Sequence, residues 1–222
     1  MRFLFYFIFA SAVTVVLVPV IKRIAYRFQV LDFPLAERKI HKKPTPLLGG
    51  VAVGLAFLLG LSLYLFSGHA DFSIIPARFF AAIFISIVIL TLGGILDDKY
   101  SLSAKVTWVF PGLASAVCVF LGIGVGITSI SNPFGGTISI DQVYLGLPLS
   151  AVFSFVWLLG MTYTTKILDG MDGLVSGIGI IGSFTLFFLS LTEKVNQPMT
   201  AMLSLLLAGA LLGFLFYNFN LP

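Results

Sequence analysis

Long apolar stretches dominate this chain and constrain its fold more than any other feature. A helix that spans a membrane needs roughly 20 mostly apolar residues, and seven stretches approach that length. They are about Phe3–Ile21, Leu48–Phe66, Ile75–Leu96, Val106–Ile127, Leu147–Thr165, Leu174–Leu191 and Met199–Tyr217. Charged residues make up 10% of the chain and hydrophobic residues 59%, which excludes an ordinary water-soluble domain. The sequence predicts an all-α, polytopic bundle of about seven transmembrane helices, forming one membrane domain over residues 1–222.

Lysines and arginines gather on one side of the predicted membrane. The connections after the first, third and fifth stretches hold ten of them, and the opposite side holds three. Because Lys and Arg are enriched in cytoplasmic loops, we expect a multi-pass protein of the inner (plasma) membrane with its N-terminus outside. The first stretch stays apolar to Val20, too long for a cleaved signal peptide. On the outer side, Gly135-Gly136 lies between the β-prone runs Thr128–Ile130 and Thr137–Ile140 and predicts a small β-hairpin.

Two pairs of aspartates lie on the predicted cytoplasmic face. Asp97 and Asp98 directly follow the third stretch, at its cytoplasmic end, where a helix C-terminus disfavours negative charge. Ionising two adjacent carboxylates is favourable only with a nearby cation. Asp169 and Asp172 are three residues apart and would share one face if their segment is helical. The alternative for the first pair is a solvated acidic turn, and for the second it is two Asp-Gly turns that join helices.

A basic, proline-containing segment leads into the second stretch and runs from His41-Lys42-Lys43-Pro44 to Gly49-Gly50. Lysine is a compact point charge that suits phosphate, and the prolines stiffen the approach to the membrane. The alternative is a positive-inside anchor that touches anionic lipid headgroups.

Carboxylates that hold a divalent cation and lysines that hold phosphates are the components of a phosphoryl-transfer site. Carboxylate ligands with retained water suit Mg²⁺, with Mn²⁺ as the alternative ion. At a membrane border, one substrate can be a lipid phosphate and the other a water-soluble nucleotide. We therefore expect these small molecules, and no nucleic acid, as partners.

These segments together resemble the motifs of the polyprenyl-phosphate N-acetylhexosamine-1-phosphate transferases, also called glycosyltransferase family 4. The superfamily includes enzymes that start teichoic acid, O-antigen and similar glycans, as well as phospho-N-acetylmuramoyl-pentapeptide transferase. The matching stretches are His41–Gly50, Gly94–Lys99 with Leu102–Lys105, Leu168–Leu174 and Gly213–Asn220. Their order and spacing agree over essentially the whole chain, and His41–Gly50 is closer to the teichoic-acid and O-antigen type.

The resemblance implies a magnesium-dependent enzyme that transfers N-acetylhexosamine-1-phosphate from a UDP-sugar, such as UDP-N-acetylglucosamine, to undecaprenyl phosphate and releases UMP. This reaction initiates cell-envelope glycan synthesis, such as that of lipopolysaccharide or teichoic acid. By the resemblance, Asp97 deprotonates or orients the lipid phosphate and Asp98 lies beside it. The further implied roles are metal binding by Asp98, Asp169 and Asp172, and substrate binding by Lys42, Lys43, Lys99, Lys105, Lys166, Asp169 and Asp172. A homodimer is an open alternative to a monomer.

The chain departs from the family pattern in two ways. The family usually has asparagines where this chain has Tyr163 and Lys166, so the nucleotide or sugar contact could differ. The family also continues, after the region that matches Asn218–Asn220, into a further aspartate motif and a histidine loop, so we expect a C-terminally truncated chain. Two alternatives follow: an inactive fragment or membrane partner, and a lipid or solute transporter, which would place ionisable residues inside its spans.

Overall fold

The computed structural model describes residues 2–32, 45–68, 76–121, 129–139, 143–144 and 147–219 of the 222-residue chain. The helices are α1 (Arg2–Arg27), α2 (Gly49–Phe66), α3 (Ala77–Tyr100), α4 (Ala104–Thr107), α5 (Val109–Phe120), α6 (Leu149–Leu168), α7 (Leu174–Ser190) and α8 (Pro198–Asn218). The strands are β1 (Leu31–Asp32), β2 (Thr45–Pro46), β3 (Ser129–Ser131), β4 (Thr137–Ser139), β5 (Val143–Tyr144) and β6 (Leu147–Pro148). Each predicted apolar stretch contains a helix, which confirms the all-α fold.

Five of these helices, α1, α2, α3, α6 and α8, are long and apolar enough to cross a membrane. Two further apolar segments, Ala104–Phe120 and α7, are shorter. At 1.5 Å per residue, the 17 residues of α7 reach about 26 Å, slightly less than a hydrocarbon core of roughly 30 Å. The chain is therefore a multi-pass membrane protein, while its orientation stays a prediction.

The fourth predicted stretch differs from a single uninterrupted helix. It is helical from Ala104, two residues before the predicted start, and it is divided at Trp108 into α4 and α5. The cause is Pro111, which has no N–H to donate to the Thr107 carbonyl one turn earlier. Residues 122–127 of this stretch lie outside the described residues.

The chain divides into two compact units. Unit 1 consists of Met1–Asp71, Thr91–Leu102 and Leu168–Pro222, and so contains α1, α2, the last part of α3, α7 and α8. Unit 2 consists of Phe72–Leu90 and Ser103–Ile167, and so contains the first part of α3, α4, α5, nearly all of α6, and β3 to β6. Helices α3 and α6 are shared between the units, and the single membrane domain stays a prediction.

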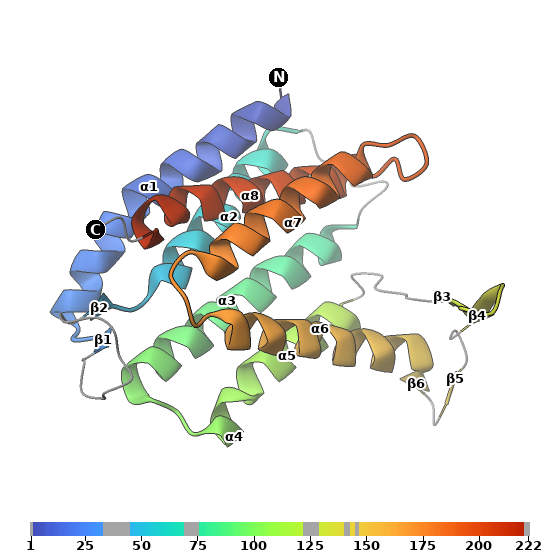
Figure 1. Ribbon diagram of the computed structural model, residues 1–222, viewed down its shortest axis with the longest axis horizontal. Helices are drawn as coiled ribbons and strands as arrows, with labels where there is room; N and C mark the ends of the chain where they lie inside the picture. The colour runs from blue at the N-terminus through green and yellow to red at the C-terminus, as the bar shows by residue number, and fades with distance from the viewer. Residues whose placement is uncertain are drawn as a thin grey trace. The chain divides into compact units, whose positions relative to one another are not determined.

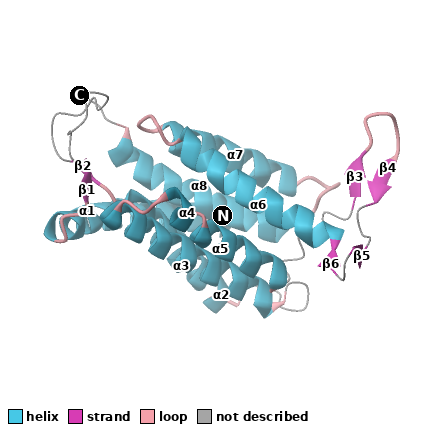
Figure 2. Cartoon of the chain, turned by 90° about the horizontal axis from the view of Figure 1, so that it is seen from below, coloured by secondary structure: helices cyan, strands magenta, loops and turns pink. Residues whose placement is uncertain are grey.

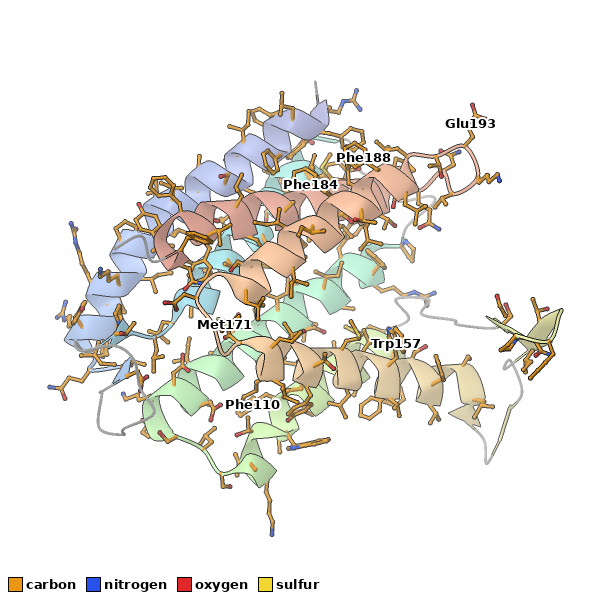
Figure 3. All side chains as sticks on the ribbon, viewed as in Figure 1. Phe110, Trp157, Met171, Phe184, Phe188 and Glu193 are labelled. Carbon is orange, nitrogen blue, oxygen red and sulfur yellow. The ribbon has the colours of Figure 1, made fainter. Side chains whose placement is uncertain are left out.

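Helix α8 is the central helix of unit 1 and packs against α1, α2 and α7 (Figure 1). Its buried side includes the small residues Ala201, Ala208 and Ala210 and the larger Leu206. Helix α7 also reaches α1 through aromatic rings: Phe3 meets Phe187 and Phe7 meets Phe184, with ring centroids 5.5 Å and 5.7 Å apart. Phe184 and Phe188, one turn apart on α7, are labelled in Figure 3. These contacts give unit 1 a continuous helical core.

Two glycines let α8 approach α1 at backbone distance. A Cβ added at Gly209 would overlap the Phe7 carbonyl, and one added at Gly213 would lie 2.5 Å from the Ser11 carbonyl oxygen. The two glycines are four residues apart, which is the GxxxG spacing that brings membrane helices into close contact. The α1–α8 interface therefore depends on the absence of side chains at these positions.

A side chain of α8 completes the hydrogen bonding of α1. Pro19 lies inside α1 and has no N–H for the carbonyl of Val15, four residues earlier. The Tyr217 hydroxyl donates to this carbonyl oxygen at 3.1 Å. This bond gives the Val15 carbonyl a donor in place of the backbone N–H that Pro19 lacks.

In unit 2, a polar contact joins α3 to α5. The Ser86 hydroxyl donates to the Ala114 carbonyl oxygen at 3.0 Å and lies 3.1 Å from the Cys118 sulfur. Ser86 and Ala114 are both buried. Such small polar residues allow membrane helices to approach and to bond across the interface.

The predicted hairpin is present in unit 2. Strands β3 and β4 are antiparallel and pair Ser129 with Ser139, Ile130 with Ile138 and Ser131 with Thr137. Gly135 and Gly136, at φ of 108° and 81°, end the connection of residues 132–136 in the left-handed region that glycine tolerates. Figure 2 shows the two arrows and the loop between them. Two shorter antiparallel pairs, β1 with β2 and β5 with β6, were not predicted.

The bond between Tyr217 and Val15 predicts a specific coupling between Tyr217 and Pro19. Tyr217→Phe removes the donor, so we expect the free energy of unfolding in detergent micelles to fall by about 0.5–2 kcal/mol. Pro19→Ala restores a backbone N–H for Val15, so the same Tyr217 substitution should cost clearly less in that background. A double-mutant cycle of thermal unfolding measures the difference. Equal costs in both backgrounds would show that the hydroxyl does not replace the missing N–H.

Candidate functional site

The first aspartate pair lies in the last turn of α3, in unit 1. Asp97 and Asp98 are both half-buried. The backbone N–H of Leu48 donates to Oδ2 of Asp98 at 3.3 Å, across 50 positions of sequence. The end of α3 is therefore connected to the start of α2, the segment that follows the predicted phosphate-binding lysines.

Leu48 itself is held in an unusual conformation. It is the N-terminal cap of α2 at φ 68° and ψ 12°, a left-handed region that costs a non-glycine residue roughly 1–2 kcal/mol. It is buried in a cluster with Ile21, Ala25, Val30 and Ala52, against which Ile95 of α3 packs. The neighbouring Leu47 N–H donates to the Val30 carbonyl at 3.2 Å. The cluster and these bonds together keep Leu48 in place.

The last turns of α8 contact both the start of α2 and the second aspartate motif. A Cβ added at Gly49 would lie 2.6 Å from Cε2 of the Phe214 ring. A Cβ added at Gly173 would lie 3.0 Å from Cδ2 of Phe219 and 3.2 Å from a methyl group of Leu215. Phe214, Leu215 and Phe219 all belong to the Gly213–Asn220 stretch. This stretch therefore links the two glycine-containing motifs within one unit.

The second aspartate pair lies in a turn between two helices, which is the alternative that the sequence left open beside a helical segment. Helix α6 ends at Leu168 and α7 begins at Leu174, and the Gly170 N–H donates to the Leu168 carbonyl at 2.8 Å. Gly173 caps α7 at φ 75°, a conformation that ends any continuous helix through Asp172. Asp169 and Asp172 are exposed in this turn, together with Met171, which Figure 3 labels.

All four predicted aspartates thus belong to unit 1. Within the described ranges, which omit 33–44 and 69–75 among others, no three His, Cys, Asp or Glu side chains are grouped closely enough to hold a metal ion by themselves. A magnesium site does not require such a group, because Mg²⁺ is usually held by one or two carboxylates plus substrate phosphates and water. The exposed pair Asp169 and Asp172 fits that donor set.

The predicted lysines are only partly accounted for. Lys42 and Lys43 lie outside the described residues. Lys99 is exposed in unit 1, with its Nζ 5.4 Å from the centroid of the Tyr100 ring. Lys105 and Lys166 are exposed in unit 2. Site membership of these lysines stays a prediction.

Of the two residues that replace asparagines of the family pattern, Tyr163 has a packing contact in the structure. The Tyr163 ring stacks on Trp108, with ring centroids 4.4 Å apart and planes at 26°. This contact joins α6 to the junction of α4 and α5 inside unit 2. Tyr163 thus has a packing function at a position where the family has asparagine. Lys166 is exposed in the last turn of α6.

Sequence reasoning missed the residues that connect the motifs. The sequence placed Phe214 and Phe219 in a stretch that matches the family, and Leu48 in the approach to α2, but it predicted no contact for any of them. The spacing of Gly209 and Gly213 was a signal for the α1–α8 interface. No local pattern predicts the bond between Leu48 and Asp98, because its partners are 50 positions apart.

Comparison with known proteins gives a consistent result. Residues 79–221 match the family described as Glycosyl transferase family 4. A probable undecaprenyl-phosphate N-acetylglucosaminyl 1-phosphate transferase of Bacillus subtilis is 33% identical over 96% of this chain and 55% of its own length. A decaprenyl-phosphate N-acetylglucosaminephosphotransferase of Mycolicibacterium smegmatis is 31% identical, over 90% of this chain and 49% of its own length.

A more distant relative, the phospho-N-acetylmuramoyl-pentapeptide-transferase of Limosilactobacillus reuteri, is 29% identical over 80% of this chain and 53% of its own length. The chain spans about half the length of the curated relatives that it matches. The family match covers most of the chain, including both aspartate motifs and the end of α8. The resemblance seen in the sequence motifs is therefore confirmed: the chain belongs to glycosyl transferase family 4.

Proposed function

We propose that this protein transfers N-acetylhexosamine-1-phosphate from a UDP-sugar to a polyprenyl phosphate, such as undecaprenyl phosphate, and releases UMP. The relatives named above as N-acetylglucosamine phosphotransferases of polyprenyl phosphates support this reaction. The observation that carries the proposal is that both aspartate motifs and the start of α2 are connected within unit 1. Asp98 accepts a hydrogen bond from Leu48 at the start of α2, and the end of α8 contacts both Gly49 and Gly173. The product would initiate synthesis of a cell-envelope glycan.

The chemistry is a phosphoryl transfer between two phosphates. An oxygen of the lipid phosphate attacks the β-phosphorus of the UDP-sugar, and the bond from that phosphorus to the bridging oxygen of UMP breaks. The sugar keeps its phosphate, a new diphosphate joins it to the lipid, and UMP leaves with the bridging oxygen. Asp97 accepts the remaining proton of the lipid phosphate or orients its oxygen for attack. Such transfers depend mostly on positioning and charge neutralisation.

Magnesium is the cation that we propose for this site. Asp169 and Asp172 would hold it together with phosphate oxygens of the substrates, and it would neutralise charge on the transferring group. Their exposure in the turn before α7 leaves them accessible to a nucleotide from water. Mn²⁺ would occupy the same donor set.

The proposed lysines supply the positive charge that two phosphate substrates require. Lys42 and Lys43 precede the start of α2, Lys99 follows Asp98, and Lys105 and Lys166 belong to unit 2. Lysine suits this role because its ammonium is a strong point charge for phosphate. We propose a cytoplasmic site in the inner (plasma) membrane, which the excess of lysine and arginine in these connections supports.

Substitution of Asp97 tests its role in proton transfer or orientation. Asp97→Asn removes the base but keeps the size of the side chain, so we expect turnover to fall about 10²- to 10⁴-fold. The measurement is release of UMP and formation of lipid-linked sugar diphosphate by the purified chain in liposomes. The matched control is Glu193→Gln in the exposed turn between α7 and α8, which should leave turnover unchanged (Figure 3).

Unchanged turnover in Asp97→Asn would contradict the assignment. No turnover by the wild-type chain, with normal binding of polyprenyl phosphate, would instead favour a membrane partner without activity of its own. Accumulation of a solute in sealed vesicles, without UMP release, would favour a transporter.

Removal of the cation tests the proposed metal site. A chelator should abolish turnover, and added Mg²⁺ or Mn²⁺ should restore it. Asp169→Asn or Asp172→Asn should raise the Mg²⁺ concentration for half-maximal turnover by about tenfold or more, since even the loss of an outer-shell partner has an effect of that size. A chelator-resistant reaction, or an unchanged Mg²⁺ requirement in both variants, would exclude this pair as the metal ligands.

A further inference from the structure

The last two turns of α1 carry a compact cationic patch. Lys22, Arg23 and Arg27 are all exposed, and Tyr26 beside them is 47% exposed. Lys22 and Tyr26 are one turn apart, and so are Arg23 and Arg27, so the four side chains are neighbours on the helix surface. No Asp or Glu occurs anywhere in α1, so no acid of this helix offsets the three positive charges. The proposed transfer reaction gives none of these four residues a role.

The patch points away from the core of unit 1. Ile21 and Ala25, one turn apart on α1, are buried in the cluster that contains Leu48. Because successive helical residues are rotated by about 100°, Arg23 and Arg27 lie almost opposite this buried side. The core therefore holds α1 by one face and leaves the two guanidinium groups on the other.

The two arginines continue an apolar stripe along α1. Val16, Val20, Arg23 and Arg27 follow one another at spacings of four, three and four residues, which places them on one face of the helix. Val16 is 67% exposed and Val20 is 45% exposed. This face thus offers an apolar surface for an acyl chain and, directly beyond it, guanidinium groups for a phosphate.

The length of α1 places the change from apolar to charged side chains at the lipid headgroups. From Phe3 to Ile21 the helix rises about 27 Å, close to a hydrocarbon core of roughly 30 Å. The segment Lys22–Arg27 extends about 9 Å further, into the headgroup layer. Ile95 of α3, two residues before Asp97, packs against the same cluster as Ile21, so the patch belongs to the leaflet of the first aspartate pair.

We propose that the last turns of α1 bind an anionic phospholipid such as phosphatidylglycerol. An acyl chain of this lipid lies along Val16 and Val20. Its phosphate is held by Arg23 and Arg27, whose planar guanidinium groups suit bidentate contact with phosphate, and Lys22 adds charge. An excess of bases alone would be enough to orient the chain in the membrane, but it would not require them to continue an apolar stripe. The lipid site is independent of the transfer reaction.

Neutralisation of the three bases tests this site. Native mass spectrometry of the purified protein, released from detergent micelles, counts the lipids that it binds during titration with phosphatidylglycerol or with phosphatidylcholine of the same acyl chains. Each base near an anionic lipid surface contributes about fivefold in affinity. Lys22→Gln, Arg23→Gln and Arg27→Gln together should therefore weaken phosphatidylglycerol binding about 10- to 100-fold. Phosphatidylcholine, which has no net charge, should bind weakly to both proteins.

The matched control removes the same charges elsewhere. Arg2→Gln, Arg78→Gln and Lys194→Gln together also remove two arginines and one lysine, all exposed and all outside the patch, and should keep the wild-type affinity for phosphatidylglycerol. If the patch variant with three substitutions does not fold, Arg23→Gln and Arg27→Gln are measured singly, and each should weaken binding about fivefold.

Equal loss of phosphatidylglycerol binding in the patch variant and the control variant would show a dependence on net charge alone and would overturn the proposal. Equal affinity of the wild-type protein for the two phospholipids would overturn it as well. A titration with undecaprenyl phosphate separates the phospholipid from the proposed substrate: if the patch variant loses only undecaprenyl phosphate, the patch belongs to the transfer site and the proposal fails. Lipid binding is read without turnover, so failure of the transfer reaction alone would contradict the proposed function and not this site.

Discussion

The close approach of α8 to α1 is the contact on which the rest of unit 1 depends. Gly209 and Gly213 let the two backbones meet, and the Tyr217 hydroxyl then reaches the Val15 carbonyl that Pro19 leaves without its helical donor. In lipid, helix association gains little from the hydrophobic effect, so tight packing and interhelical hydrogen bonds must supply it. With α8 fixed in this way, its last turns are placed beside Gly49 and Gly173.

The end of α8 therefore both packs unit 1 and positions the segments of the proposed site. Phe214 contacts the start of α2, and Phe219 and Leu215 contact the turn that carries Asp169 and Asp172. A Cβ at position 49 would overlap the Phe214 ring, and a side chain at position 173 would be strained by the φ of 75° as well as tightly packed against Phe219. A phosphoryl-transfer site depends on positioning, so residues that fix its segments matter as much as residues that touch phosphate. This explains why the Gly213–Asn220 stretch belongs to the family pattern without containing a charged residue.

The helices were predictable because each follows from an apolar stretch of sufficient length, and the β3–β4 hairpin was predictable from Gly135-Gly136. Spacing alone could not decide between a helix and a turn for Asp169 and Asp172, because the turn depends on the left-handed conformation of Gly173, which packs against Phe219. The bond of Asp98 to Leu48 could not be predicted for a related reason: it joins helix ends brought together only by the packed cluster around Leu48. Asp97 and Asp98 could be identified from the sequence because two adjacent carboxylates at a helix C-terminus are electrostatically unfavourable unless a cation compensates them.

Photo-crosslinking from the end of α8 tests most directly whether the motifs meet there. A benzophenone amino acid placed at position 214 should attach to the peptide that contains Gly49, and one placed at position 219 to the peptide from Asp169 to Leu174. Mass spectrometry of the protein in native-like membranes identifies both products. Attachment of both probes to lipid alone, or to peptides of unit 2, would contradict the arrangement and with it the proposed site.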